Sequence, residues 1–519
     1  MTSTNRVAIL GFDAADPTLV RRGAEAGVLP HFAALIERSY RGEIENQAGL
    51  QAGSVWASFA RGVSVGDHGQ YDGLRRFNPE TYEIDGFADD GRFGSEPFWR
   101  RLSSTGKRVG IIEAPYAHLT EDLNGVEISN WGTHDPVEPG GLSATTWPPE
   151  LAGELLDTFG REPLRGKECD LIAPRTRRQI TTFRDQMVQR ARTRGDMIEW
   201  LFPREPWDFF LATYSEAHCV GHQCWKVHDP ERPDHDPRLA RRIGDPVEDV
   251  YRALDDELGR FLAMIGDDVT TVVYLSHGME PSVSGTVLLD KILVRLDGGD
   301  IADRSHGPIG LLRTTWKRLP PQFRIALAPV MHRIWPQGVG SAMQGNRDRR
   351  RFFEVNANNT TGGVRINLKG REARGLVEPG EEYDRLLDQL RLDLMEIINL
   401  DTGEPLAERV VETRELYPDG AYLDTLPDLL VDWNKRAGSG DIVRVRSPKI
   451  GTIDNGTPGP RSGDHGKTSG MFLAFGPGIE PGQHSEIVSV IDLAPTVLTL
   501  LDTPIDGLDG TPIGPICGR

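Results

Sequence analysis

The chain contains 519 residues, carries a formal net charge of −18, and is 38% hydrophobic and 26% charged. This length suits about two to four domains, or one large α/β core with insertions, and the composition excludes a disordered chain. The acidic balance disfavours nucleic-acid binding, and four cysteines without paired spacing exclude a disulfide scaffold or zinc ribbon. No apolar run approaches the roughly 20 residues of a membrane span. The sequence therefore predicts a soluble, cytoplasmic protein without a membrane partner.

Short apolar runs alternate with helix-period segments along the chain. Strands are predicted within 6–16, 107–116, 125–136, 207–225 and 269–280, most of them ending in polar residues. Helical periodicity is seen at 17–37 and at 245–265, where one face carries apolar residues such as Val250 and Leu254. This order predicts a mostly parallel sheet covered on both faces by helices. Ligands of such sheets bind outside the carboxyl ends of the strands.

Residues 301–352 differ from the rest, with ten Lys or Arg residues against two acidic ones. We interpret them as part of an inserted cap or lid, whose arginines at 347–351 could recognise phosphate or carboxylate groups. A basic surface loop or a subunit contact is the alternative. Core-like patterns return with a helix at 383–398 and strands at 426–433 and 471–479. The expected division is a core over 1–281, an inserted cap over 282–354 and the rest of the core over 355–519.

Five residues at predicted strand ends could converge on one rim of the sheet. His218 and His222 are four residues apart just past a strand, a spacing that a zinc ion can use at a helix start. Asp13 ends the first strand, His277 lies at a strand tip, and His465 lies in a loop that enters the strand at 471–479. The alternative is that each is a satisfied polar residue at a strand end.

Sequence motifs at these positions occur in a fixed order. They are LGFDAADPTLV, AGSVWASFARGVSVGDHGQYD (52–72), SEAHCVGHQCW, VVYLSHGM and RSGDHGKTSGMFLAFGPGI. In this order they resemble the alkaline phosphatase superfamily, particularly its type I phosphodiesterase/nucleotide pyrophosphatase branch. The resemblance implies an alkaline-phosphatase-like α/β fold with an inserted cap. It also implies metal-dependent hydrolysis of a phosphodiester, pyrophosphate or related phosphorus ester.

The resemblance implies a principal metal site at His218, His222 and His465, where a carboxylate of the family has become a third imidazole. Zinc is the expected ion, with iron or manganese as alternatives, and one or two ions per chain. Three neutral imidazoles leave the charge of zinc uncompensated. A zinc ion held in this way lowers the pKa of its bound water towards ~7. A side-chain nucleophile is therefore not obligatory.

A second metal site is implied at Asp13, Ser276 and His277, with the family's nucleophile at the position of Ala52. An alanine cannot attack a substrate, and a neutral serine hydroxyl is a poor replacement for a carboxylate ligand. This second site has at most two good ligands, so it is either empty or completed by a residue outside the motifs.

Further candidates rest on weaker patterns. Ser54 could be a nucleophile if the loop is shifted, and otherwise caps a helix start. Glu216 could be a metal ligand or a general base, and otherwise is solvated. Asp464 could orient an imidazole. Three polar residues could line the substrate pocket, although two of them lie in a turn-like segment: His134, Asn358 and Asn359.

Three functions stay open at this point. The first is hydrolysis of a small, anionic phosphorus ester. The second is a single-metal enzyme of specialised metabolism that performs transfer, lyase or non-phosphorus hydrolytic chemistry. The third is a non-catalytic relative that binds a ligand. Two bound metal ions per chain would count against the second function, and the sequence does not determine the substrate or the oligomeric state.

Overall fold

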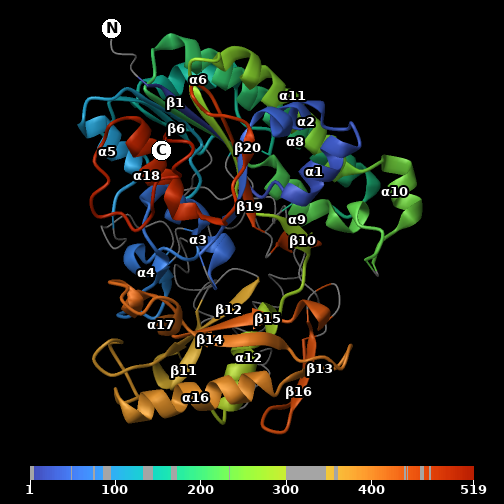
Figure 1. Cartoon of the computed structure of the whole chain (residues 1–519). Coiled ribbons are helices and arrows are strands. Elements are labelled where there is room, and N and C mark those ends of the chain that lie inside the picture. Colours follow the sequence, from blue (N-terminus) through green and yellow to red (C-terminus); the bar gives the residue numbers. More distant parts are fainter. Residues whose placement is uncertain are drawn as a thin grey trace.

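The computed structural model describes residues 5–47, 49–73, 76–85, 95–132, 144–164, 172–232, 234–299, 347–355, 360–437, 440, 442–455, 461–466 and 469–518. Two units are visible in Figure 1, a large α/β unit in the upper part and a smaller unit below it. Among the helices described, none combines the length and apolar character needed to cross a membrane.

A ten-stranded sheet forms the centre of the large unit. Its strands are β1 (Val7–Phe12), β2 (Tyr40–Glu45), β5 (Val109–Ile112), β6 (Gly125–Ser129), β7 (Thr145–Trp147), β8 (Phe209–Tyr214), β9 (Thr270–Leu275), β19 (Gly470–Phe475), β20 (Gly482–Gln483) and β21 (Val488–Ser489). The order is β20-β2-β19-β9-β1-β8-β5-β6-β7, and β21 pairs with β2.

The middle of this sheet is parallel. β1 pairs in parallel with β8 on one side and β9 on the other, so that Phe12, Tyr214 and Leu275 end three adjacent strands at one edge. β5 and β6 continue the parallel part, whereas β7 and β19 are antiparallel to their neighbours. The predicted mostly parallel sheet is confirmed, and the residues after β1, β8 and β9 share one rim.

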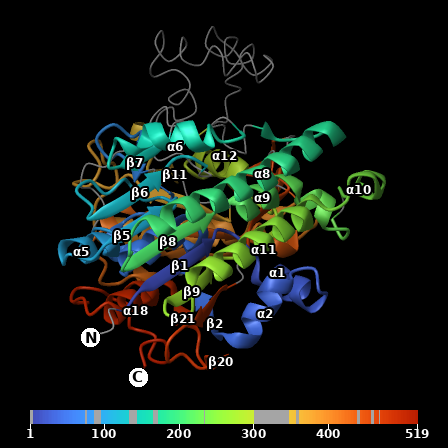
Figure 2. The same cartoon turned by 90° about the horizontal axis from the view of Figure 1, so that it is seen from above.

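Helices cover both faces of the sheet (Figure 2). The helices α2 (Pro30–Arg38), α8 (Arg177–Leu201), α9 (Glu216–His228) and α11 (Pro246–Ile265) bury their apolar sides in one core. The helices α3 (Gln51–Arg61), α5 (Phe98–Ser104) and α18 (Leu493–Leu500) form the core on the opposite face. The apolar face expected at 245–265 is confirmed in α11, whose Val250, Leu254 and Leu258 are buried.

The smaller unit has its own sheet and its own core. Its four antiparallel strands have the order β11-β12-β15-β14, where β11 is Phe352–Val355, β12 is Thr361–Ile366, β14 is Ala407–Glu412 and β15 is Leu429–Trp433. A second, three-stranded sheet has the order β13 (Ile398–Asn399), β16 (Arg444–Ser447), β17 (Gly451–Asp454). The helices α12 (Thr286–Leu296) and α16 (Glu381–Met395) pack into the same core.

Residues from 355 onward were expected to belong to the core, but several of their strands pair in the separate sheet of the smaller unit. The segments expected at 383–398 and 426–433 form α16 and β15, which belong to the smaller unit. Their apolar patterns are those of any buried helix or strand, so periodicity could not tell which sheet they join. Only the strand expected at 471–479 returns to the large sheet, as β19. Most of the expected cap, residues 300–346, lies outside the described residues, and the domain limits stay a prediction.

Candidate metal centre

Two imidazoles come from the first turns of α9. This helix begins at Glu216, directly after β8 and Ser215, so His218 and His222 lie one turn apart at the rim of the sheet. Both side chains are buried, and their Nε2 atoms are 2.8 Å apart. The i, i+4 spacing in the sequence thus becomes a pair of nitrogens that face the same point.

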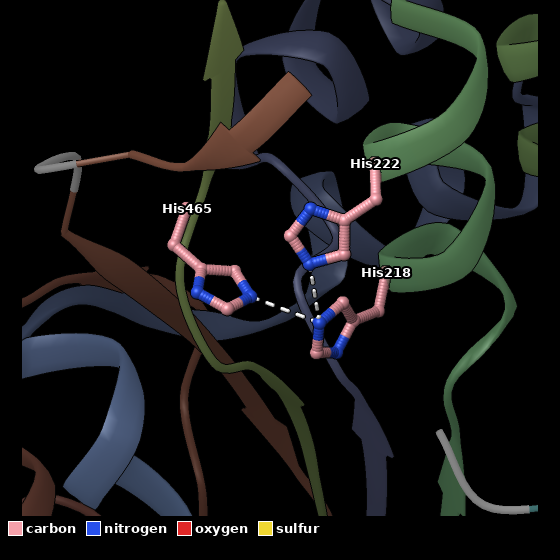
Figure 3. Close-up of side chains that lie close together, drawn as sticks. All are labelled: His218, His222 and His465. Atoms are coloured by element: carbon pink, nitrogen blue, oxygen red, sulfur yellow. Dashed lines mark hydrogen bonds between the residues drawn. The ribbon is translucent and has the colours of Figure 1, made fainter. Parts of the chain in front are cut away.

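The third imidazole comes from the far end of the chain. His465 ends β18 (Gly463–His465), which pairs antiparallel with β10 (Met279–Pro281), a short strand just after β9. This pairing places His465 opposite α9, with its Nε2 atom 2.9 Å from Nε2 of His218 (Figure 3). The three imidazoles form the one potential metal-binding group identified within the described part of the chain.

Hydrogen bonds at Nδ1 orient two of the imidazoles. Nδ1 of His222 donates to the backbone carbonyl of Gly463 at 2.9 Å, and Nδ1 of His218 lies 2.5 Å from Oδ2 of Asp13. When Nδ1 carries the proton of a neutral ring, Nε2 presents a lone pair. Two lone pairs 2.8 Å apart in a buried place repel one another unless a cation lies between them. The donor set therefore fits a divalent ion, with the outer hydrogen bonds that metal-binding histidines usually make.

Asp13 follows β1 and is almost completely buried. Besides its contact with His218, its Oδ1 accepts hydrogen bonds from Nε1 of Trp56 at 2.7 Å and from Oγ of Ser276 at 3.3 Å. Burial alone would raise the pKa of Asp13, but His218, His277 and Trp56 hold it below the ordinary value for an aspartate. Asp13 is therefore ionised and serves as a buried hydrogen-bond acceptor.

His277 completes the group of five. It lies two residues beyond the end of β9, its ring centroid is 4.7 Å from that of His465, and its Nε2 is 3.7 Å from Oδ1 of Asp13. Burial lowers the pKa of His277, although Asp13 opposes this shift. The structure thus brings together Asp13, His218, His222, His277 and His465, as strand-end reasoning expected, while their roles as ligands stay a prediction.

The family of the chain follows from a comparison with known proteins. The model for type I phosphodiesterase / nucleotide pyrophosphatase matches residues 7–466, which include all five of these side chains. The chain belongs to this family. No curated protein sequence matches it.

Solved structures support the same fold. Alkaline phosphatase PafA superposes with a TM-score of 0.58 at 14% identity, over 100% of both chains. Murine ectonucleotide pyrophosphatase/phosphodiesterase 5 gives 0.51 at 13% identity over 98% of both chains. Its human counterpart gives 0.51 at 12% identity, over 98% of this chain and 97% of that one. These likenesses confirm the alkaline-phosphatase-like fold. Family and fold together support a phosphoryl hydrolase.

Other predicted residues of this phosphodiesterase-family chain lie in less reactive surroundings. Glu216 is fully buried, and its carboxylate accepts hydrogen bonds from Arg190 at 2.9 Å and from Arg194 at 2.7 and 2.9 Å. Ser54 lies inside α3 and donates from Oγ to the carbonyl of Leu50 at 2.8 Å. Their roles as general base and nucleophile stay predictions, and neither is seen within hydrogen-bond reach of the three imidazoles.

The remaining residues that the sequence singled out lie beside His222, in the smaller unit, in α3 or outside the described residues. Asp464 is buried, and its Oδ1 lies 3.9 Å from Nδ1 of His222, beyond a direct hydrogen bond. Among the basic residues at 347–351, Arg350 pairs with Asp290 and Arg351 with Asp297, both inside the smaller unit. Three substrate candidates lie outside the described residues: His134, Asn358 and Asn359. Ala52 lies in the first turn of α3.

Sequence reasoning missed Trp56. A tryptophan on the apolar face of a helix is read as core, and nothing in the sequence indicates that its indole N–H reaches Asp13. A cavity of about 630 Å³ does not help to locate the chemistry, because it lies beside α2 and β2 and its lining includes Ile36, Arg41 and His484 but none of the five site residues.

Proposed function

We propose that the chain hydrolyses a small, anionic phosphorus ester with a divalent metal ion, most readily zinc, held by His218, His222 and His465. The observation that carries this proposal is the convergence of three buried Nε2 atoms on one point. In His218 and His222 the Nδ1 atom is hydrogen-bonded to Asp13 and to the carbonyl of Gly463, which leaves the Nε2 lone pair directed at that point. Family membership supplies the reaction class. A murine relative, in an inactive form, was solved with AMP, which suits a phosphorus ester as substrate.

Residues of the chain would orient the ligands of a bound ion and accept a proton beside it. A bound divalent ion would supply Lewis acidity and lower the pKa of water at the site. Asp13 and the carbonyl of Gly463 hold the rings of His218 and His222 in one orientation. His277 donates from Nδ1 to the carbonyl of Gly278 at 3.2 Å, so Nε2 of its neutral ring can accept a proton from water or from a substrate hydroxyl.

A second candidate function is transfer, lyase or non-phosphorus hydrolytic chemistry at the same metal. It is favoured by Ala52, which stands at the position where the family resemblance places a nucleophile, and by the neutral hydroxyl of Ser276. Binding without catalysis is the remaining alternative. A small anionic substrate and a cytoplasmic location stay predictions from the sequence.

Metal content and hydrolysis should be measured on protein purified without added metal. We expect wild type to contain zinc or a related ion, His218→Ala to lack it, and His484→Ala to retain it. His484 is a suitable control because its Nδ1 bonds to the Tyr40 hydroxyl at 2.6 Å, away from the centre.

The substrate test uses bis(p-nitrophenyl) phosphate, p-nitrophenyl phosphate and p-nitrophenyl acetate. Hydrolysis of a phosphate ester that is abolished by chelator and by His218→Ala supports the proposal. Acetate hydrolysis alone would favour the second candidate. Metal-free wild-type protein would contradict both.

A further inference from the structure

The resemblance to two-metal relatives places a second ion beside Asp13, Ser276 and His277, and the contacts seen here do not fit such an ion. Oδ1 is the oxygen of Asp13 closest to His277. This oxygen already accepts from Nε1 of Trp56 at 2.7 Å and from Oγ of Ser276 at 3.3 Å. Two donors occupy both lone pairs of a carboxylate oxygen. A cation between Asp13 and His277 would have to displace them.

The indole of Trp56 occupies the space left by the missing side chain of Gly11 in β1. Gly11 lies two residues before Asp13, on the same face of the strand, and a Cβ at Gly11 would lie only 2.7 Å from Cη2 of Trp56. The ring therefore lies directly over Gly11, with its N–H reaching Asp13. Phe59 and Tyr274 pack edge-on against the indole with ring centroids 5.4 and 5.2 Å away. Trp56 is buried and has little room to turn aside.

The hydroxyl of Ser276 is also already hydrogen-bonded. Its Oγ accepts a hydrogen bond from the backbone N–H of Ala14 at 3.0 Å and donates its single proton to Asp13. The side chain carries no negative charge to offset a dication. Nδ1 of His218 lies 2.5 Å from Oδ2, the other carboxylate oxygen of Asp13. Three donors thus surround one carboxylate in the place where the resemblance expects an ion.

We propose that the chain binds one metal ion rather than two, because Trp56 and Ser276 convert Asp13 from a metal ligand into the partner that orients His218. Trp56 is then a positioning residue, acting on the metal through Asp13 and His218. This inference rests on the proposed three-histidine centre.

The test measures the number of zinc ions per chain and the zinc affinity by competition with a chromogenic chelator. Trp56→Phe keeps an aromatic ring and removes the N–H. The matched control is Trp99→Phe, since Trp99 is a buried tryptophan of the same core whose indole bonds to the Thr120 hydroxyl at 3.1 Å. Both changes are also made together with Ser276→Asp, which restores a carboxylate. Circular dichroism verifies folding.

We expect one zinc per wild-type chain even in excess zinc. Zinc binding should weaken by about 10-fold in Trp56→Phe and stay unchanged in Trp99→Phe, as expected when an outer partner of a ligand is released. Trp56→Phe/Ser276→Asp should bind two ions and Trp99→Phe/Ser276→Asp one.

Two zinc ions in wild type would overturn the inference while leaving the three-histidine centre intact, and this count does not depend on any variant folding. Equal zinc affinity of folded Trp56→Phe and Trp99→Phe would overturn it as well. Wild type without zinc would overturn the centre itself, and with it this inference.

Discussion

Arg194 and Glu216 form a two-bond ion pair in which both side chains are inaccessible to solvent. Arg194 lies on α8 and Glu216 is the first residue of α9, so this pair fixes the start of the helix that carries His218 and His222. Arg190, one turn before Arg194, donates to the same carboxylate. The acid therefore anchors the helix that carries His218 and His222 against α8.

Replacing Glu216 by glutamine should mainly lower stability. Two buried arginines would lose the charged carboxylate that they share, and breaking such a pair costs about 3 kcal/mol or more. Urea unfolding should show this loss, while kcat/KM of the folded fraction keeps its dependence on pH. Disappearance of the acidic limb of the kcat/KM profile, with unchanged stability, would instead identify Glu216 as a general base.

Ser54→Ala should leave hydrolysis of a phosphodiester within a few-fold of wild type. The hydroxyl of Ser54 is bonded to Leu50 inside α3, so its removal should cost about 1 kcal/mol of stability at most. Initial rates and thermal unfolding of the two proteins test this. A loss of activity by several orders of magnitude without loss of metal would show that Ser54 is the nucleophile after all.

Zinc should stabilise the folded protein. An ion that binds only the native state at 1,000 times its Kd adds about 4 kcal/mol to the free energy of unfolding. We therefore expect the melting temperature of the metal-stripped wild type to rise on adding zinc, and that of His465→Ala to rise much less. His228→Ala is the control, because His228 bonds to Asp245 rather than facing the centre. A similar rise in all three proteins would indicate zinc binding elsewhere.

Glu127 should make stability depend on pH. It is fully buried on β6, where burial raises its pKa from 4.5 to about 7. Between these values the folded protein holds a proton that the unfolded chain has released. The contribution of this proton to stability is thus complete below pH 4.5 and is lost as the pH rises through about 7.

Glu127→Gln should therefore be more stable than wild type by about 3 kcal/mol at pH 8 and nearly equal to it at pH 4.5. The glutamine oxygen can still accept the hydrogen bond from the backbone N–H of Thr120. Urea unfolding of both proteins at the two pH values measures the difference. An equal difference at both pH values would rule out a titrating Glu127.

The large sheet and the convergence of the site could be predicted because they depend on local patterns. Apolar runs followed by polar residues marked β1, β8 and β9, and parallel order places the ends of such strands on one rim. Asp13, His218 and His277 were found by this rule. His465 was included because it precedes the strand expected at 471–479, but it reaches the rim by a route that this pattern does not describe, the pairing of β18 with β10.

Two features escaped the sequence because they depend on packing between distant elements. Whether Asp13 faces a metal or hydrogen-bond donors depends on an indole from α3 lying over Gly11, which no periodicity describes. Likewise, the pattern of β15 shows a buried strand but does not show that its partners are β12 and β14.

The pairing of β10 with β18 also determines when the proposed metal centre can form. His465 lies 247 residues after His218, and the whole smaller unit is synthesised between them. A nascent chain that has completed α9 offers a metal only two of its three imidazoles, and the third arrives when β18 docks on β10. If these imidazoles hold the metal, tight loading would follow translation through residue 465. An ion encountered earlier would meet an open half-site and be released again.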